Sequence, residues 1–106
     1  MDTILRASTE ISTIMVVEDD PAVLSATRML LKVEGYRVTT AASLSEALQK
    51  ARENADLDLL ITDYHLAGGE TGTEVISSVR GILGANLRTV LITGDTSNAV
   101  KELRHD

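Results

Sequence analysis

The sequence alternates between short apolar runs and longer segments of helical periodicity, and this alternation is the feature that most limits its fold. Four runs have the length and β-branched content of strands, at residues 13–17, 37–41, 59–62 and 90–93. Helical segments separate them, and a fourth follows at residues 97–104. Strands alternating with helices indicate parallel pairing. We therefore expect an α/β fold with a doubly wound parallel sheet, in the order β-α-β-α-β-α-β-α.

Local signals mark the ends of the predicted helices. Asp20 and Pro21 provide an N-cap followed by proline at the first helical position, and Gly35 ends that helix. A capping box at residues 43–46 opens a second helix that runs to about residue 53, and a third runs from about residue 73 to 83. The first helix carries an apolar stripe at helical spacing, of the kind that faces a core, made of Val23, Ala26, Thr27, Leu30 and Val33.

Composition narrows the class of protein. The 106 residues are enough for one domain with a core. Two Tyr without Phe or Trp, and a net charge of −6, argue against nucleic acid and an anionic membrane as partners. The absence of Cys excludes disulfides and thiolate sites, and no apolar stretch approaches the roughly 20 residues that span a bilayer. We expect a soluble cytoplasmic domain at residues 13–106 after a leader or linker at residues 1–12.

Oxygen-bearing residues follow three of the predicted strands. Glu18, Asp19 and Asp20 follow the first, Asp63 follows the third, and Thr93 closes the fourth. Because the carboxyl ends of parallel strands share one edge of the sheet, we expect these groups to converge. Asp20 is expected only to cap the helix. Any other single acid could also be a cap, but acids gathered at one place repel one another, and a bound Mg²⁺ would remove that cost.

Asp63 ends the most hydrophobic strand, where an unpaired charge is expensive. Alone it could cap the following turn, whereas beside the first cluster it would be the third carboxylate of an oxygen-ligand site. A carboxylate can attack phosphorus to give an aspartyl phosphate, with Mg²⁺ offsetting the charge. Thr93 is consistent with an ordinary strand residue or with a hydroxyl that donates to a phosphoryl oxygen, Gly94 leaving the approach open.

Taken in order, these motifs resemble the receiver domain of two-component response regulators. The segments that carry the resemblance are Ile14–Pro21, Asp58–Asp63 and Leu91–Gly94. Residues 63–76 and 91–97 are most similar to the C-terminal receivers of hybrid sensor histidine kinases. The resemblance implies a flavodoxin-like receiver fold and a phosphoacceptor signalling domain of a phosphorelay, not an enzyme with an external substrate.

The resemblance also implies a role for each site residue. Asp63 would be the phosphoacceptor, taking a phosphoryl group from the phosphohistidine of a histidine kinase or a histidine phosphotransfer protein. Mg²⁺ would be bound by Asp63, by Asp19 directly, by Glu18 through water, and by the backbone carbonyl of His65. Thr93 would be the switch hydroxyl. The His65 side chain would either tune the loss of phosphate or be a simple exposed loop residue.

The chain departs from the family pattern in two places. Ala67 stands where receivers commonly have Pro, which changes the stiffness of the loop. The chain ends at Asp106, so we expect four βα units of the usual five, without the strand-five Lys that contacts the phosphoryl group. Lys101 lies in the predicted fourth helix and is a poor substitute. The fourth strand would then be an open edge that favours self-association.

Two other functions stay open on the sequence alone. One is a shortened, receiver-like module that binds a kinase or phosphotransfer protein but switches weakly or not at all. The other is a Mg²⁺-dependent phosphohydrolase of similar doubly wound form. Such enzymes usually place two acids at alternate positions after the first strand, with the nucleophile among them. Here the lone acid, Asp63, follows the third strand, which disfavours the phosphohydrolase.

Overall fold

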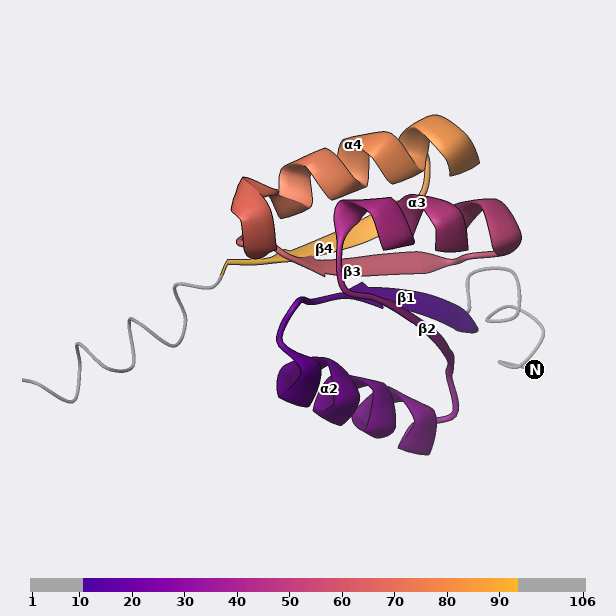
Figure 1. Ribbon diagram of the computed structural model, residues 1–106. Coiled ribbons are helices and arrows are strands. Elements are labelled where there is room, and N and C mark those ends of the chain that lie inside the picture. Colours follow the sequence, from indigo (N-terminus) through magenta and orange to yellow (C-terminus); the bar gives the residue numbers. More distant parts are fainter. Residues whose placement is uncertain (1–10, 94–106) are drawn as a thin grey trace, which may run out of the picture.

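The computed structural model describes residues 11–93, in which one four-stranded sheet lies between two layers of helices (Figure 1). The strands are all parallel, and their order in the sheet is β2-β1-β3-β4. They are β1 (Thr13–Val17), β2 (Arg37–Ala41), β3 (Leu59–Asp63) and β4 (Arg88–Ile92). The predicted α/β fold with a doubly wound parallel sheet is confirmed, while the helix predicted at residues 97–104 lies outside the described residues.

Helices cover the two faces of the sheet unequally. Helix α2 (Pro21–Val33) lies alone on one face, and α3 (Leu44–Glu53) and α4 (Gly72–Leu83) lie side by side on the other (Figure 1). The main core fills the space beneath α3 and α4, where Met15 and Leu60 of the sheet are fully buried with Val75 and Val79 of α4. This core contains aliphatic side chains and no aromatic ring. None of the described helices is long and apolar enough to cross a membrane.

The predicted starts of α2 and α3 are confirmed, but the predicted capping box of α3 is incomplete. Asp20 Oδ1 accepts hydrogen bonds from the backbone N–H groups of the first turn of α2, at 2.9 and 3.3 Å. At α3, Ser43 accepts from the N–H of Glu46 at 3.1 Å, as a capping box requires. The Glu46 side chain accepts from Ala42 instead of Ser43, at 2.8 Å, so the predicted box is only half formed.

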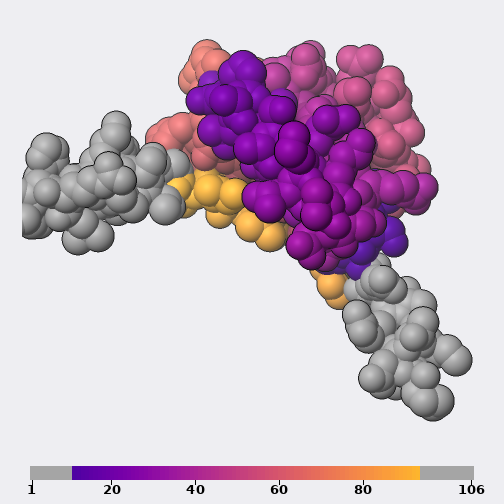
Figure 2. Space-filling model, turned by 90° about the horizontal axis from the view of Figure 1, so that it is seen from below, coloured from indigo at the N-terminus to yellow at the C-terminus, as the bar shows by residue number. Residues whose placement is uncertain are grey.

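Helix α2 buries less of its apolar surface than its stripe predicts. Its half-buried side chains are Leu24, Thr27 and Leu31, and no residue of α2 is fully buried. Within the predicted stripe, Leu30 is 66% exposed and Val33 is 78% exposed. Figure 2 views this face and shows β4, in yellow and orange, uncovered on it. The stripe therefore has the predicted spacing, but only its Thr27 side faces the sheet. The rest of the stripe stays exposed because no other helix of residues 11–93 lies beside α2 on this face.

Candidate functional site

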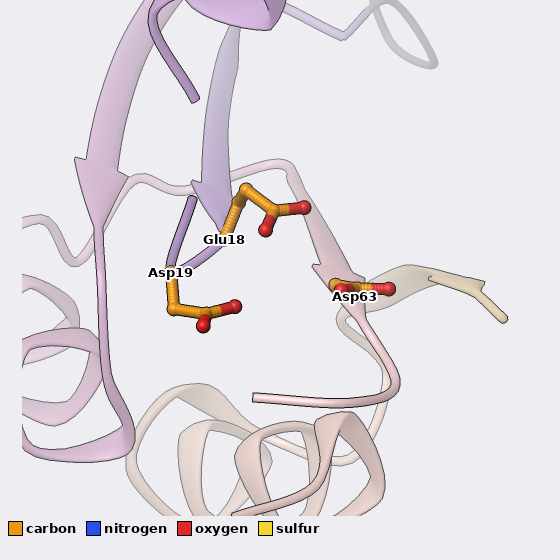
Figure 3. A group of neighbouring side chains, drawn as sticks. All are labelled: Glu18, Asp19 and Asp63. Carbon is orange, nitrogen blue, oxygen red and sulfur yellow. The ribbon is translucent and has the colours of Figure 1, made fainter. Parts of the chain in front are cut away.

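Three of the predicted site residues meet at the carboxyl edge of the sheet. Val17, the last residue of β1, pairs with Thr62 of β3, so the residues that follow each strand are neighbours. Glu18 and Asp19 come from the loop after β1, and Asp63 is the last residue of β3 (Figure 3). One carboxylate oxygen from each of the three lies within 4.8 Å of the others. The predicted convergence of these acids is observed.

Negative charge is concentrated at this cluster. Burial raises the pKa of Glu18 above its ordinary value, and the charges of Asp63 and Asp19 raise it further. The N–H of Asp20 acts in the opposite direction, because it donates to Glu18 Oε2 at 3.0 Å and stabilises the ionised form. Within residues 11–93 the one ion pair joins exposed Arg37 and Asp56, so no ion pair of the described chain neutralises the cluster.

The donor set fits a hard divalent cation. Three half-buried carboxylates gather around one position, and oxygen ligands of this kind are those that Mg²⁺ prefers. A cation there would offset the repulsion that raises the pKa of Glu18. The carboxylate of Asp20 is engaged differently, because it caps α2 through its bonds to Ala22 and Val23. Its predicted role as the cap of α2 is confirmed.

Thr93 and His65 lie at the same edge of the sheet. Ile92 pairs in register with Asp63, and Thr93 follows it directly as an exposed residue. His65 is an exposed loop residue two positions after Asp63, and its ring meets that of Tyr64 edge-on with centroids 4.8 Å apart. Lys101, the basic residue considered from the sequence, lies outside the described residues.

The loop after Asp63 is held at both ends by backbone hydrogen bonds. The N–H of Tyr64 donates to the carbonyl of Ile92, and the carbonyl of Tyr64 accepts from Gly72, both at 2.7 Å. Between these points the chain makes a short 3-10 turn at Ala67–Gly69. Gly68 and Gly69 adopt φ values of 76° and 80°, which glycine tolerates best. The loop thus turns on the two glycines that directly follow Ala67.

Three features of this loop were not predicted. The start of α4 carries a complete capping box between Thr71 and Glu74, although the spacing Thr-x-x-Glu is visible in the sequence. Gly72 is buried against the strand end, where a Cβ would clash with the carbonyl oxygen of Asp63. The Glu70 side chain bonds to the start of α3. No sequence signal indicates the last two contacts, because each depends on how segments that are distant in the sequence pack against one another in the fold.

Comparison with known proteins places this chain in one family. Residues 14–105 match the family model of the response regulator receiver domain. The transcriptional regulatory protein KdpE of Mycobacterium tuberculosis is 34% identical over 90 residues, which cover 85% of this chain and 39% of KdpE. The two-component response regulator ARR11 of Arabidopsis thaliana is 31% identical over 93 residues, covering 87% of this chain and 18% of ARR11.

Solved structures agree with this assignment. The chemotaxis protein CheY4 of Vibrio cholerae superposes with a TM-score of 0.73 at 29% identity, covering 87% of this chain and 76% of that chain. The receiver domain of the hybrid histidine kinase CckA gives a TM-score of 0.68 at 31% identity, and the match covers 89% of this chain and 97% of that chain. The predicted likeness to hybrid-kinase receivers therefore has some support, but regulators of other kinds are equally similar.

The chain forms a doubly wound parallel sheet with three carboxylates at its carboxyl edge, and the family model matches it over residues 14–105. Together these findings define a receiver-type signalling domain rather than a classical enzyme. The chain belongs to the response regulator receiver domain family of two-component signal transduction. It spans about two-fifths of the length of KdpE, of which it covers 39%. Membership of this family gives the phosphohydrolase alternative no support.

Proposed function

We propose that this chain is a phosphoacceptor receiver domain whose acceptor is Asp63. The observation that carries the proposal is the meeting of Glu18, Asp19 and Asp63 within 4.8 Å at the carboxyl edge of a receiver fold. The donor would be a phosphohistidine on a histidine kinase or a histidine phosphotransfer protein. Mg²⁺ would be held by these three carboxylates and by the backbone carbonyl of His65.

The proposed transfer moves one phosphoryl group between two protein side chains. A carboxylate oxygen of Asp63 forms a bond to phosphorus, and the phosphorus–nitrogen bond of the phosphohistidine breaks. The electron pair of that bond leaves with the imidazole. Bound Mg²⁺ would offset the negative charge on the transferring group. The hydroxyl of Thr93, at the end of the neighbouring strand, would donate to a phosphoryl oxygen and report the change of state.

The test is the melting temperature of the chain with and without Mg²⁺ plus beryllofluoride, a mimic of aspartyl phosphate. A ligand that binds only the folded state stabilises it, by about 2.7 kcal/mol at one hundred times its dissociation constant. We expect a clear rise in the melting temperature for the wild type and for Asp56→Asn, an exposed acid outside the cluster. We expect no beryllofluoride-dependent rise for Asp63→Asn. A cooperative melt of the wild type that ignores both ligands would instead favour the weakly switching interaction module.

We also propose that the chain associates with itself through β4. Among the described residues β4 is paired only with β3, which leaves its other edge without a strand partner. Leu91 lies near Gly72 of α4, so the side chains of Val90 and Ile92 lie on the opposite face, which is the face that carries α2. Val90 is 45% exposed and Ile92 is 47% exposed. An exposed apolar edge strand favours pairing with another chain.

A further inference from the structure

A carboxylate from the loop after Asp63 contacts the beginning of a different helix. Glu70 Oε1 accepts a hydrogen bond from the backbone N–H of Leu44, the first residue of α3, at 2.9 Å. The two residues are 26 positions apart in the sequence, and the bond is partly buried. The side chain of Leu44 packs against the main core. The loop that follows the acceptor strand is therefore joined to a helix that the core holds in place.

The bond between Glu70 and Leu44 is present in addition to the N-cap of α3, which is Ser43. Ser43 already accepts from Glu46 at 3.1 Å, within the same turn. The N–H of Leu44 belongs to the first turn, whose amides have no partner inside the helix. A carboxylate at this end also meets the positive end of the helix dipole. Glu70 comes from another segment of the chain. It thus places a negative charge at the start of α3, where the helix dipole favours one.

The loop is folded so that Glu70 faces α3. After the turn at Gly68 and Gly69, the carbonyl of Glu70 accepts from the N–H of Leu66 at 3.0 Å, and the side chain of Leu66 is buried in the core. His65 forms an isolated antiparallel bridge with Thr71. The backbone of His65 is therefore held between two fixed points, which are the end of β3 on one side and the segment around Glu70 on the other.

We propose that Glu70 is a positioning residue of the phosphoacceptor site. Its bond to Leu44 holds the loop of residues 64–71 against α3 and thereby fixes the backbone of His65, whose carbonyl is a proposed metal ligand. The consequence for Mg²⁺ rests on the proposed function, whereas the consequence for the loop does not. Removing the bond loosens the loop, weakens Mg²⁺ binding and leaves Glu18, Asp19 and Asp63 in place.

The first experiment measures two properties of Glu70→Ala. Amide hydrogen exchange of the metal-free protein reports whether protection is lost at Leu44 and Leu66. Titration with Mg²⁺, followed by the emission of Tyr64 in a Tyr36→Phe background, reports the metal affinity next to Asp63. We expect faster exchange at both amides and a roughly 2- to 10-fold weaker affinity for Mg²⁺, the factor that corresponds to losing one hydrogen bond. Glu70→Gln keeps an oxygen acceptor and should retain most of the affinity.

A second variant removes the same bond from the other side. Leu44→Pro deletes the donor N–H at the first helical position, where proline is tolerated. Ser43 is already extended, at φ −155° and ψ 168°, as a residue before proline must be. Leu44→Ala keeps the N–H while losing the side chain, so it is the matched control. We expect Leu44→Pro to weaken Mg²⁺ binding beyond Leu44→Ala, by the factor seen for Glu70→Ala. Glu53→Ala, an exposed acid at the other end of α3, should behave as wild type.

The outcomes separate this inference from the proposed function. Failure of the wild type to bind Mg²⁺ would refute the proposed function, while hydrogen exchange in the metal-free protein would still test the Glu70 contact. Wild-type exchange and affinity in Glu70→Ala would overturn the positioning role. Faster exchange with an unchanged Mg²⁺ affinity would also overturn it, because the bond would then serve stability alone.

Discussion

At the scale of single residues, Glu18 is held where its charge is disfavoured. Burial raises its pKa first, the charges of Asp63 and Asp19 add to this, and only the N–H of Asp20 opposes it. Because the folded pKa lies above the unfolded value, the folded chain holds the proton of Glu18 more tightly than the unfolded chain does. This contribution to stability is fully present below the unfolded pKa and is lost as the pH rises through the folded pKa.

We therefore predict that Glu18→Gln raises the melting temperature of the metal-free protein at pH 7. The amide keeps an oxygen that can accept from Asp20 and removes the charge that faces Asp63 and Asp19. The gain should stay below about 1 kcal/mol, since partly exposed charges are screened by water. Thermal melts followed by circular dichroism, with a chelator present, should show the gain shrinking as the pH falls toward 4.

The control for this pH dependence is Asp56→Asn, which removes an exposed acid that lies outside the cluster. It should show no comparable gain at pH 7. A melting temperature of Glu18→Gln below that of the wild type at pH 7, or a gain that does not depend on pH, would contradict the electrostatic account.

Much of the site at this scale follows from the sequence, for a simple geometric reason. Residues that end parallel strands must share an edge, so Glu18, Asp19 and Asp63 could be placed together from the strand pattern alone. Glu70 could not, because its bond to Leu44 depends on where the loop after β3 lies relative to α3. A contact between a loop and the start of a helix leaves no periodic trace in either segment.

At the scale of secondary-structure elements, the start of α4 lies directly against the end of β3 at Gly72. A Cβ at this buried position would clash with the carbonyl oxygen of Asp63 and would lie 2.6 Å from Leu91 Cδ1. The N–H of Gly72 also donates to the carbonyl of Tyr64 at 2.7 Å. Only a residue without a side chain lets the helix start against the strand end that carries Asp63, the proposed acceptor.

We predict that Gly72→Ala lowers the free energy of unfolding by about 1–3 kcal/mol, the range for inserting a methyl group into packed structure. The same substitution should weaken Mg²⁺ binding, because the backbone of Asp63 must move to make room. Urea denaturation and the Tyr64 titration measure the two effects.

The control lies on the same helix. Gly81 has no atom within 4 Å of a built Cβ, so Gly81→Ala should stabilise α4 by about 0.5–1 kcal/mol through helix propensity. Equal stabilisation by both substitutions would show that the close approach at Gly72 is unimportant.

The elements show where sequence patterns succeed and where they fail. β1 and β2 were predicted to the residue, since a continuous apolar run and a β-branched run have sharp ends. β4 begins two residues before its predicted start, because Arg88 and Thr89 are polar residues that the apolar run does not include. The stripe of α2 is broad, and its spacing alone cannot tell which flank faces the sheet. Burial shows that the Thr27 side does, while Leu30 and Val33 stay exposed.

At the scale of the whole molecule, the two faces of the sheet differ in how completely they are covered. The face beneath α3 and α4 holds the core, while the other carries only α2 among the described helices (Figure 1). On that second face, which Figure 2 views, α2 and the edge strand β4 carry large apolar side chains that are exposed. These side chains are Val23, Met29, Leu30, Val33, Val90 and Ile92. The proposed site adjoins this surface at Ile92, which pairs with Asp63, whereas Val90 lies two residues further from the carboxyl edge.

This asymmetry leads to the last prediction, that the chain associates with itself through β4 and that one charge on this strand prevents it. Val90→Lys places a charge on the exposed edge strand, the means by which natural proteins block edge pairing. The sedimentation coefficient of the wild type should rise from micromolar to millimolar concentration, while that of Val90→Lys should stay at the monomer value.

Met29→Lys makes the same change at a residue of α2 that is 64% exposed, and it should associate as the wild type does. A wild type that stays monomeric, or a Met29→Lys that is as monomeric as Val90→Lys, would count against β4 as the interface. Since Val90→Lys leaves all three carboxylates in place, its response to Mg²⁺ and beryllofluoride should match that of the wild type, which would show that association and acceptor chemistry are independent.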